Sequence, residues 1–202
     1  LLSKEAESNA IRDSDGRTAL QANICCKKNI DVVETLISAN ADVNKPDKAN
    51  FTPLYMAVEK QDLQIIKFLL EHGAKLELAG DSGDQPIHMA SALCNIFIMK
   101  ILLDKGASLD IANNTGSTLL HEVIDKENVA LQSDPQKKID ATKYLLARGA
   151  KTDLPNKEGK PPIDLAKTDL PEVLEFLEHP ENIGLLTDLE SALLGNFNYD
   201  EI

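Results

Sequence analysis

Apolar side chains recur along this chain at the three- and four-residue spacing of amphipathic helices. A glycine follows several of these stretches, and glycine readily takes the left-handed conformation that ends a helix. We therefore predict a helix ahead of Gly73, of Gly106 and of Gly149. The clearest apolar positions are Leu63, Ile65, Ile66, Leu69 and Leu70 in one stretch and Ile98, Ile101 and Leu102 in the next.

A shorter helix is predicted upstream of each of these. Thr52-Pro53-Leu54 opens one such helix, because threonine is a good N-cap and proline at the first helical position loses no needed N–H. Related phrases start at residues 18, 52, 85, 118 and 161. A turn residue precedes each phrase, with successive intervals of 34, 33, 33 and 43 residues from Gly16 to Gly159. The chain is therefore expected to repeat one two-helix unit with a period of about 33 residues.

This period and these phrases resemble those of the ankyrin repeat family. The clearest copy is NFTPLYMAVEKQDLQIIKFLLEHGAKL, in which Tyr55 replaces the histidine of the family's T-P-L-H-x-A pattern. His88 and His121 retain that histidine, whereas Gln21 and Asp164 replace it. The resemblance covers about residues 1–179. It implies an all-α solenoid of about five stacked helix-turn-helix units with β-hairpin-like loops.

The same phrases predict the domain organisation. We expect an ankyrin repeat domain over residues 1–180 and a capping helix with an acidic tail over residues 181–202. Leu1 and Leu2 align with the last turn of a second helix, so the array is expected to begin before residue 1. The repeats are expected at 1–12 (the end of a truncated repeat), 13–45, 46–79, 80–112, 113–154 and 155–180.

The repeat at 113–154 has about ten residues more than the period requires. We predict that its first helix is lengthened by a turn or two and that a loop follows at 133–135. Insertions of this kind lie on one face of a repeat array, often the binding face. A lengthened connection without a function is equally consistent with the sequence, because loops tolerate insertions.

Charge and cysteine content narrow the function. The formal net charge of −12 disfavours nucleic acids and anionic membrane surfaces as partners. The three cysteines include adjacent Cys25 and Cys26, which does not suggest a disulfide scaffold, so we expect a reducing, cytoplasmic location. The apolar runs are too short to span a bilayer. We also expect a monomer.

The sequence contains little that would indicate an enzyme. The string GDSGD at 80–84 matches the nucleophile loop of chymotrypsin-like proteases, but it falls in phase with the repeat turns. We interpret it as a turn, because a triad also needs a base and an orienting acid on the right scaffold. The histidines lack zinc-binding spacing, and no phosphate-binding glycine motif is present. We therefore predict no catalytic, metal-binding or cofactor-binding residue and no enzymatic activity.

The resemblance implies protein–protein recognition by a concave surface of hairpin tips and first helices. Phe51 is the first candidate, since aromatic residues are favoured interface anchors, and an acidic chain favours a partner with a basic patch. For each position the alternative is a solvated surface residue. The predicted partner-binding positions are Arg17, Lys48, Phe51, Tyr55, Glu59, Lys60, Asp81, Asp84, Leu93, Asn114, Ser117, Asp125 and Lys126.

Two further hypotheses follow from the resemblance. LISANADVN at 36–44 is similar to the ankyrin consensus of cytosolic asparaginyl hydroxylases, which would make Asn44 an acceptor, although Asn44 can equally well support the hairpin. The alternative function is a non-catalytic targeting domain of a larger enzyme or effector. The irregular Lys/Asn/Ile-rich repeats resemble those of effectors that intracellular bacteria deliver into the host cytosol.

Overall fold

The computed structural model describes residues 9–12, 14–26, 29–125, 134–183, 188, 191 and 192. Over these residues the chain forms short helices in pairs, connected by hairpin loops, with one isolated antiparallel bridge between Ile11 and Thr18. It divides into two compact units between Asp81 and Ser82. The all-helical paired architecture predicted from the period is confirmed within each unit.

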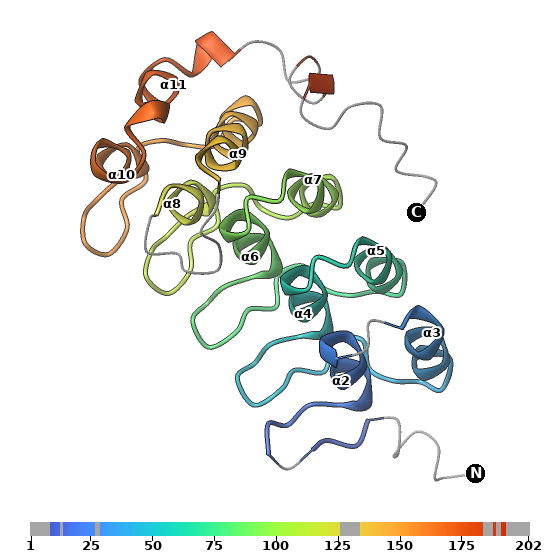
Figure 1. Cartoon of the computed structure of the whole chain (residues 1–202). Helices are drawn as coiled ribbons and strands as arrows, with labels where there is room; N and C mark the ends of the chain where they lie inside the picture. Colours follow the sequence, from blue (N-terminus) through green and yellow to red (C-terminus); the bar gives the residue numbers. More distant parts are fainter. Residues whose placement is uncertain are drawn as a thin grey trace. The chain divides into compact units, whose positions relative to one another are not determined.

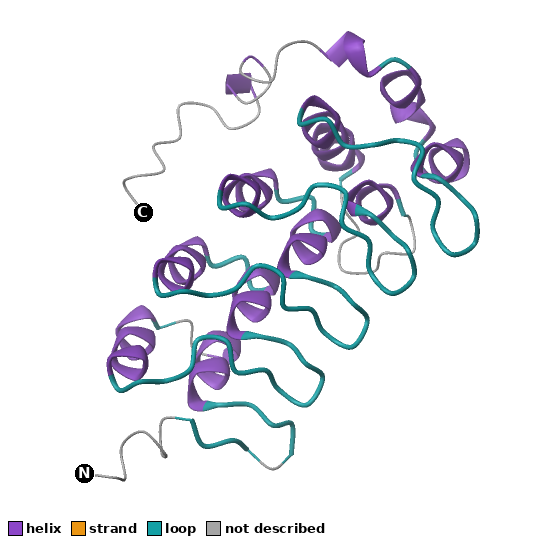
Figure 2. Ribbon diagram, turned by 180° about the vertical axis from the view of Figure 1, so that it is seen from behind, coloured by secondary structure: helices purple, strands orange, loops and turns teal. Residues whose placement is uncertain are grey.

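The first unit, N-terminal to Ser82, holds two complete helix pairs. Its first helices α2 and α4 pack on each other, and its second helices α3 and α5 do the same. Figures 1 and 2 show the hairpin loops extending away from α3 and α5, on the far side of α2 and α4. The helices are α2 (Ala19–Cys26), α3 (Ile30–Ser38), α4 (Pro53–Glu59) and α5 (Leu63–Glu71).

The second unit repeats this arrangement. Helix α6 packs on α7 and α8, and α8 packs in turn on α9 and α10. The last repeat is compressed, because its second helix is only five residues long and is flanked by two 3₁₀ turns. The elements are α6 (Pro86–Ala92), α7 (Ile96–Asp104), α8 (Leu119–Ile124), α9 (Pro135–Ala147), α10 (Pro162–Asp169), η1 (Pro171–Val173), α11 (Leu174–Glu178) and η2 (Pro180–Ile183).

The helix ends follow from local hydrogen bonding. The Thr52 hydroxyl accepts from the Tyr55 N–H at 3.2 Å, and the Asp62 carboxylate accepts from the Ile65 N–H at 3.1 Å. These side chains satisfy N–H groups that a helix N-terminus leaves unpaired. Gly73 follows the C-cap of the second helix α5, and its φ of 84° is left-handed. The predicted caps and stops are therefore confirmed.

The core consists of aliphatic side chains and small residues where helices meet. Ala57, Ala90 and Ala166 are completely buried, and their small side chains let neighbouring helices approach closely. Ile66 and Leu69 of α5 are also completely buried. One two-helix unit cannot cover such side chains by itself, so stacking of neighbours within each unit stabilises the fold.

The prediction for the inserted segment is wrong in its details. Helix α8 ends at Ile124, and Asp125 has φ −55° and ψ 124°, which is not helical. The second helix is the longer one, because Asp134 caps it and Pro135 begins it. The Asp134 carboxylate accepts from the Gln136 N–H at 3.0 Å. Residues 126–133 lie outside the described residues.

Other predictions fall partly beyond the described chain. The expected helix turn at Leu1 and Leu2 lies outside it, as does most of the 181–202 segment. None of the helices in the described part of the chain has the length and the apolar composition that a membrane span requires.

Candidate functional site

In three hairpin tips, one side-chain oxygen accepts hydrogen bonds from two backbone N–H groups of the same tip. The Oδ1 atom of Asp47 accepts from the Ala49 and Phe51 N–H groups, each at 3.0 Å. Asn113 and Asn156 make the equivalent pairs of bonds at 2.9–3.0 Å in the second unit. Asp and Asn commonly stabilise turns in this way. These tips are therefore fixed by a short side chain at their base.

Successive tips within each unit are also connected through their backbones. The Lys48 N–H donates to the Asp15 carbonyl at 3.0 Å, and the Asp81 N–H donates to the Ala49 carbonyl at 3.1 Å. In the second unit the Asn114 and Lys157 N–H groups each donate at 2.9 Å to the preceding tip. The side chains at these four positions are exposed.

The close approach of the tips explains their glycines. A Cβ atom on Gly116 would lie 2.8 Å from the Lys157 nitrogen, and the φ of Gly116 is 79°. A larger residue there would both strain the backbone and push the next tip away.

At His88 and His121, the family's histidine position connects the first helix to the following hairpin. Nδ1 of His121 accepts from the Thr118 N–H at 3.0 Å, and Nε2 donates to the Lys160 carbonyl at 3.0 Å. His88 makes the equivalent bonds to Gln85 and Ile111. A ring that accepts at one nitrogen and donates at the other must be neutral.

Gln21 makes the same connection without a ring. Its Oε1 accepts from the Thr18 N–H at 2.8 Å, and its Nε2 donates to the Phe51 and Lys45 carbonyls at 2.9 and 3.1 Å. The sequence identified Gln21 only as a departure from the family pattern. The sequence did contain a signal of this role, because the Gln21 amide occupies the histidine position of its repeat.

Burial also disfavours the charged form of the two histidines. Loss of solvation lowers the pKa of His88 and of His121 below the ordinary value of histidine. Both rings are 1% exposed. These residues are structural connectors in the second unit.

Phe51 packs against its own repeat and against the start of the next one. Its ring stacks on the ring of Tyr55, with centroids 4.3 Å apart and planes 22° from parallel. A Cβ atom on Gly80 would lie 2.4 Å from Phe51 Cε1, so the ring also lies against the backbone of Gly80. Phe51 is half-buried and Tyr55 is 7% exposed. The aromatic ring that the sequence suggested as a surface anchor is thus packed against the fold.

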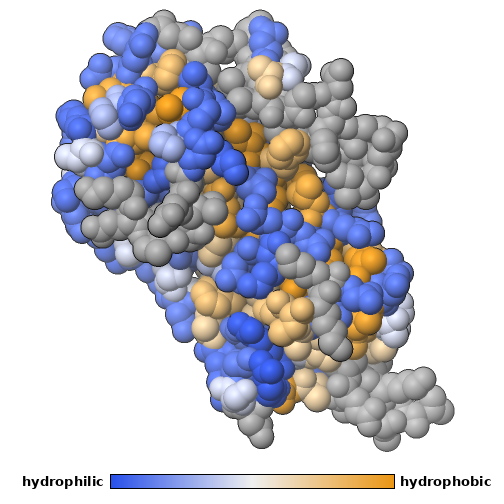
Figure 3. Space-filling view, in the orientation of Figure 1, coloured by the Kyte–Doolittle hydropathy of each residue, from blue (hydrophilic) through white to orange (hydrophobic). Residues whose placement is uncertain are grey.

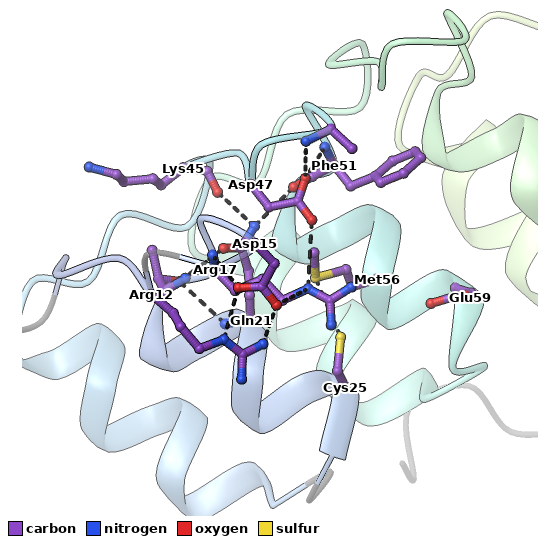
Figure 4. A network of polar contacts seen from close by, with 12 residues as sticks. Arg12, Asp15, Arg17, Gln21, Cys25, Lys45, Asp47, Phe51, Met56 and Glu59 are labelled. Carbon is purple, nitrogen blue, oxygen red and sulfur yellow. Dashed lines mark hydrogen bonds and ion pairs between the residues drawn. The ribbon is translucent and has the colours of Figure 1, made fainter.

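Charged side chains surround the first hairpin. Arg12 forms two hydrogen bonds with the Asp15 carboxylate, and they hold the pKa of Asp15 well below its ordinary value. Nε of Arg17 lies 3.6 Å from Asp15 Oδ2 and 3.6 Å from Asp47 Oδ2 (Figure 4). In Figure 3 this hairpin is a hydrophilic patch at the lower end of the view, bordered by apolar residues.

In the second unit, two predicted positions are held by neighbouring side chains. Asp84 accepts from Asn113 at 2.8 Å and from Ser82 at 2.7 Å. The Ser117 hydroxyl accepts from the Thr115 hydroxyl at 3.0 Å. These hydrogen bonds fix the positions of the Asp84 and Ser117 side chains.

The thirteen predicted binding positions thus differ in accessibility. Tyr55 and Leu93 are each 7% exposed, and we leave both out of the proposed surface because a partner cannot reach them. Lys126 lies outside the described residues. The exposed positions are Lys48, Glu59, Asp81 and Asn114, and the half-buried ones are Arg17, Phe51, Lys60, Asp84, Ser117 and Asp125.

Asn44 connects the ends of two successive repeats. Its Nδ2 donates to the Gly73 carbonyl at 3.0 Å, and its Oδ1 accepts from the Lys75 N–H at 2.8 Å. Asn9 makes similar bonds to Asn40 and Asp42. The hairpin-supporting interpretation of Asn44 therefore has direct support in the geometry, and hydroxylation stays a prediction.

The setting of Cys25 does not favour thiolate chemistry. Burial raises the pKa of the Cys25 thiol, and its Sγ contacts Met56 Sδ at 3.6 Å. A raised pKa lowers the thiolate fraction on which nucleophilic reactivity depends.

The comparisons with known proteins agree with this geometry. A family model described as ankyrin repeats (3 copies) matches residues 1–79, and a single ankyrin repeat model matches residues 82–114. Together the matches cover more than half of the chain. No curated protein matches the chain.

Proposed function

This chain belongs to the ankyrin repeat family, and from that premise we propose that it binds a partner protein through its hairpin tips and the adjacent faces of its first helices. Repeats of this family generally serve as protein–protein interaction modules. The proposed surface has one part in each unit. It consists of Arg17, Lys48, Phe51, Glu59, Lys60 and Asp81 in the first unit and Asp84, Asn114, Ser117 and Asp125 in the second.

One observation carries this proposal. The bonds that connect successive tips use the backbone N–H of residues 48, 81, 114 and 157, so any residue except proline can make them. All four side chains are exposed, and they are lysine, aspartate, asparagine and lysine. A rigid backbone that presents different side chains at equivalent positions suits recognition, because binding residues work best on a fixed scaffold.

The experiment compares tip variants with a control on the opposite side of the first unit. The chain is immobilised, and the proteins that it retains from a lysate are identified by mass spectrometry. The charge-reversed variant Lys48→Glu with Asp81→Lys should lose the specific partner, whereas Glu71→Lys on α5 should keep it. Retention of the same proteins by all three chains would overturn the proposed surface.

Affinities with the purified partner then make the test quantitative. Reversal of one rim charge should weaken binding by about two- to fivefold through a slower association rate, and high salt should reduce the difference. Equal affinities for the tip variant and the wild type would count against these positions.

Modification of Asn44 is a separate proposal. The two hydrogen bonds of its carboxamide mean that a hydroxylase would first have to free this segment from residues 73–75. Mass spectrometry of the chain after exposure to an asparaginyl hydroxylase would show a mass increase of one oxygen atom on the Asn44 peptide. An unshifted peptide would exclude the modification.

A further inference from the structure

One end of the first unit leaves apolar side chains uncovered. Among the described residues, the large hydrophobic side chains that are exposed are Ile11 and Val32, at 52% and 38% exposure. Figures 1 and 2 show α5 beside α3 on one side, and no described helix lies on the other side of α3. A terminal repeat of a stack normally has a polar outer face, so this end does not have the character of a cap.

The repeat register identifies Val32 as a position that is buried elsewhere. Ile65 of α5 and Ile98 of α7 follow it at successive intervals of 33 residues, and they are 1% and 0% exposed. Val33, the next residue of α3, is completely buried, as is the equivalent Ile66. Within the first unit α5 packs on the preceding α3, whereas no described helix precedes α3 as its second-helix neighbour. Helix α3 is therefore uncovered on one side only.

Two further positions show the same difference. Leu36 of α3 is half-buried, whereas Leu69 at the same position of α5 is completely buried. In the first helices, Ala19 is exposed at the position where α4 and α8 bury Pro53 and Leu119. Helices α2 and α3 pack on each other, so these side chains belong to one end of the unit. We define the end face as Ala19, Val32 and Leu36.

A connection between repeats already stands ahead of α2. Asn44, which follows α3 in the chain, hydrogen-bonds the segment that follows α5. Asn9 makes the equivalent pair of bonds to the segment that follows α3. Its Nδ2 donates to the Asn40 carbonyl at 3.1 Å, and its Oδ1 accepts from the Asp42 N–H at 2.7 Å. Asn9 therefore occupies the place that follows a second helix, and it marks where a preceding helix pair would be connected.

We propose that the end face is the docking surface of one further two-helix repeat, connected to the chain ahead of Asn9. This inference goes beyond the proposed function, because it concerns the end of the stack and not the hairpin tips. The occupant covers Val32 and Leu36 with an apolar helix side, as α3 covers α5. A second copy of the chain is disfavoured, since two chains with a net charge of −12 repel each other and their contact would leave the position of Asn9 unexplained.

The test adds a repeat from the chain's own sequence. A copy of residues 46–68 is joined ahead of Leu1, so that Leu1 and Leu2 take the places of Leu69 and Leu70 in the added unit. Hydrogen exchange with mass spectrometry then compares the full chain with this extended chain. Amide exchange in α2 and α3 should slow by about tenfold, whereas α10, near the other end of the chain, should keep its rates. Unchanged rates in α2 and α3 would overturn the proposal.

Val32→Lys supplies a second measurement. In the unextended chain the valine is exposed, so the substitution should shift the urea midpoint little. In the extended chain the lysine would be buried, and the substitution should abolish the slowing of exchange in α3. Glu34→Ala on the same helix is the matched control, because Glu34 is exposed and should have no effect in either chain. An equal effect of Val32→Lys in both chains would contradict the proposed docking surface.

Sedimentation of the unextended chain tests the second copy as occupant. A monomer over a wide range of concentrations supports the proposal. A dimer that Val32→Lys dissociates would assign the end face to a second copy and overturn it. None of these measurements involves the hairpin tips, so a failure of this inference would leave the proposed function standing.

Discussion

At the scale of single residues, buried polar side chains connect successive repeats by hydrogen bonds. His88, His121 and Gln21 each accept from their own helix start and donate to the next hairpin. The comparison shows that this connection uses a donor and an acceptor at opposite ends of one side chain, and that a glutamine can make it as well as an imidazole. A glutamine meets this need without becoming charged in acid.

His121→Gln is therefore expected to flatten the pH dependence of stability. The pKa of buried His121 is lowered in the folded state, so the unfolded chain binds more protons near the ordinary histidine pKa of about 6.5. Stability due to the neutral ring is present above that pH and is lost as the pH falls through it, by at most about 1.4 kcal/mol per pH unit. Urea unfolding at pH 7.5 and 5.5 measures the difference.

The exposed residue His72 supplies the control for this prediction. His72→Gln should leave the wild-type pH profile unchanged, whereas His121→Gln should lose less stability in acid than the wild type. An identical acid loss in both variants would contradict the role assigned to His121.

Phe51→Ala is expected to destabilise the chain. The ring stacks on Tyr55 and lies against Gly80, so its removal opens a gap in a half-buried contact. Complete burial makes Phe→Ala cost about 3–5 kcal/mol, and we expect about 1–3 kcal/mol here. Urea denaturation measures this loss, with Lys48→Ala on the same tip as the neutral control. Unchanged stability of Phe51→Ala would show that these contacts of the ring do not stabilise the fold.

At the scale of elements, the repeat pattern predicted what local chemistry determines. The Thr52-Pro53 start, the stop at Gly73 and the buried face of α5 all depend on the sequence within one repeat, and all three are found. Contacts between particular residues of different repeats were harder to predict from the sequence. The contact of Phe51 with Gly80 joins positions 29 residues apart, and it follows no family rule.

The inserted repeat and the binding surface show the same limit of prediction from sequence. The sequence placed a loop at 133–135, although Asp134 and Pro135 form a good helix start. Leu93 was assigned to the surface from its repeat position, but it is apolar and buried at the C-cap of α6. Among the described residues, Nε of Arg17 has no hydrogen-bond partner because both neighbouring carboxylate oxygens lie 3.6 Å away, and no pattern of residue types contains that distance.

Helix α9 contains a buried group that weakens the fold. The hydroxyl of Thr142 is completely buried and has no hydrogen-bond partner among the described residues. Thr142→Val removes the unsatisfied hydroxyl with little change of shape, so the free energy of unfolding should rise by about 1 kcal/mol. Thr118→Val is the matched contrast, because the Thr118 hydroxyl hydrogen-bonds His121 at 2.9 Å, and it should lower stability by about 1 kcal/mol. Equal effects of the two changes would contradict this assignment.

At the scale of the whole molecule, net charge is a poor guide to the charge of the tips. Residues 164–202 contain ten acidic side chains and one lysine, which accounts for most of the excess of acids. The tip positions 48, 81, 114 and 157 carry mixed charges instead. The basic partner patch inferred from the overall charge therefore depends on which part of the chain makes contact.

Stability should likewise be distributed along the chain, because each repeat packs mainly on its neighbours. Helix α11 contacts α9, α10 and the two 3₁₀ turns, and Leu177 in it is 2% exposed. Leu177→Ala should therefore reduce amide-exchange protection in α9, α10 and α11 and leave α2 to α5 unchanged. Hydrogen exchange with mass spectrometry resolves these segments, and Glu178→Ala on the exposed side of α11 is the control. A uniform loss of protection from α2 to α11 would instead show that the chain unfolds as one cooperative unit, because only global coupling could carry the effect of Leu177 into α2.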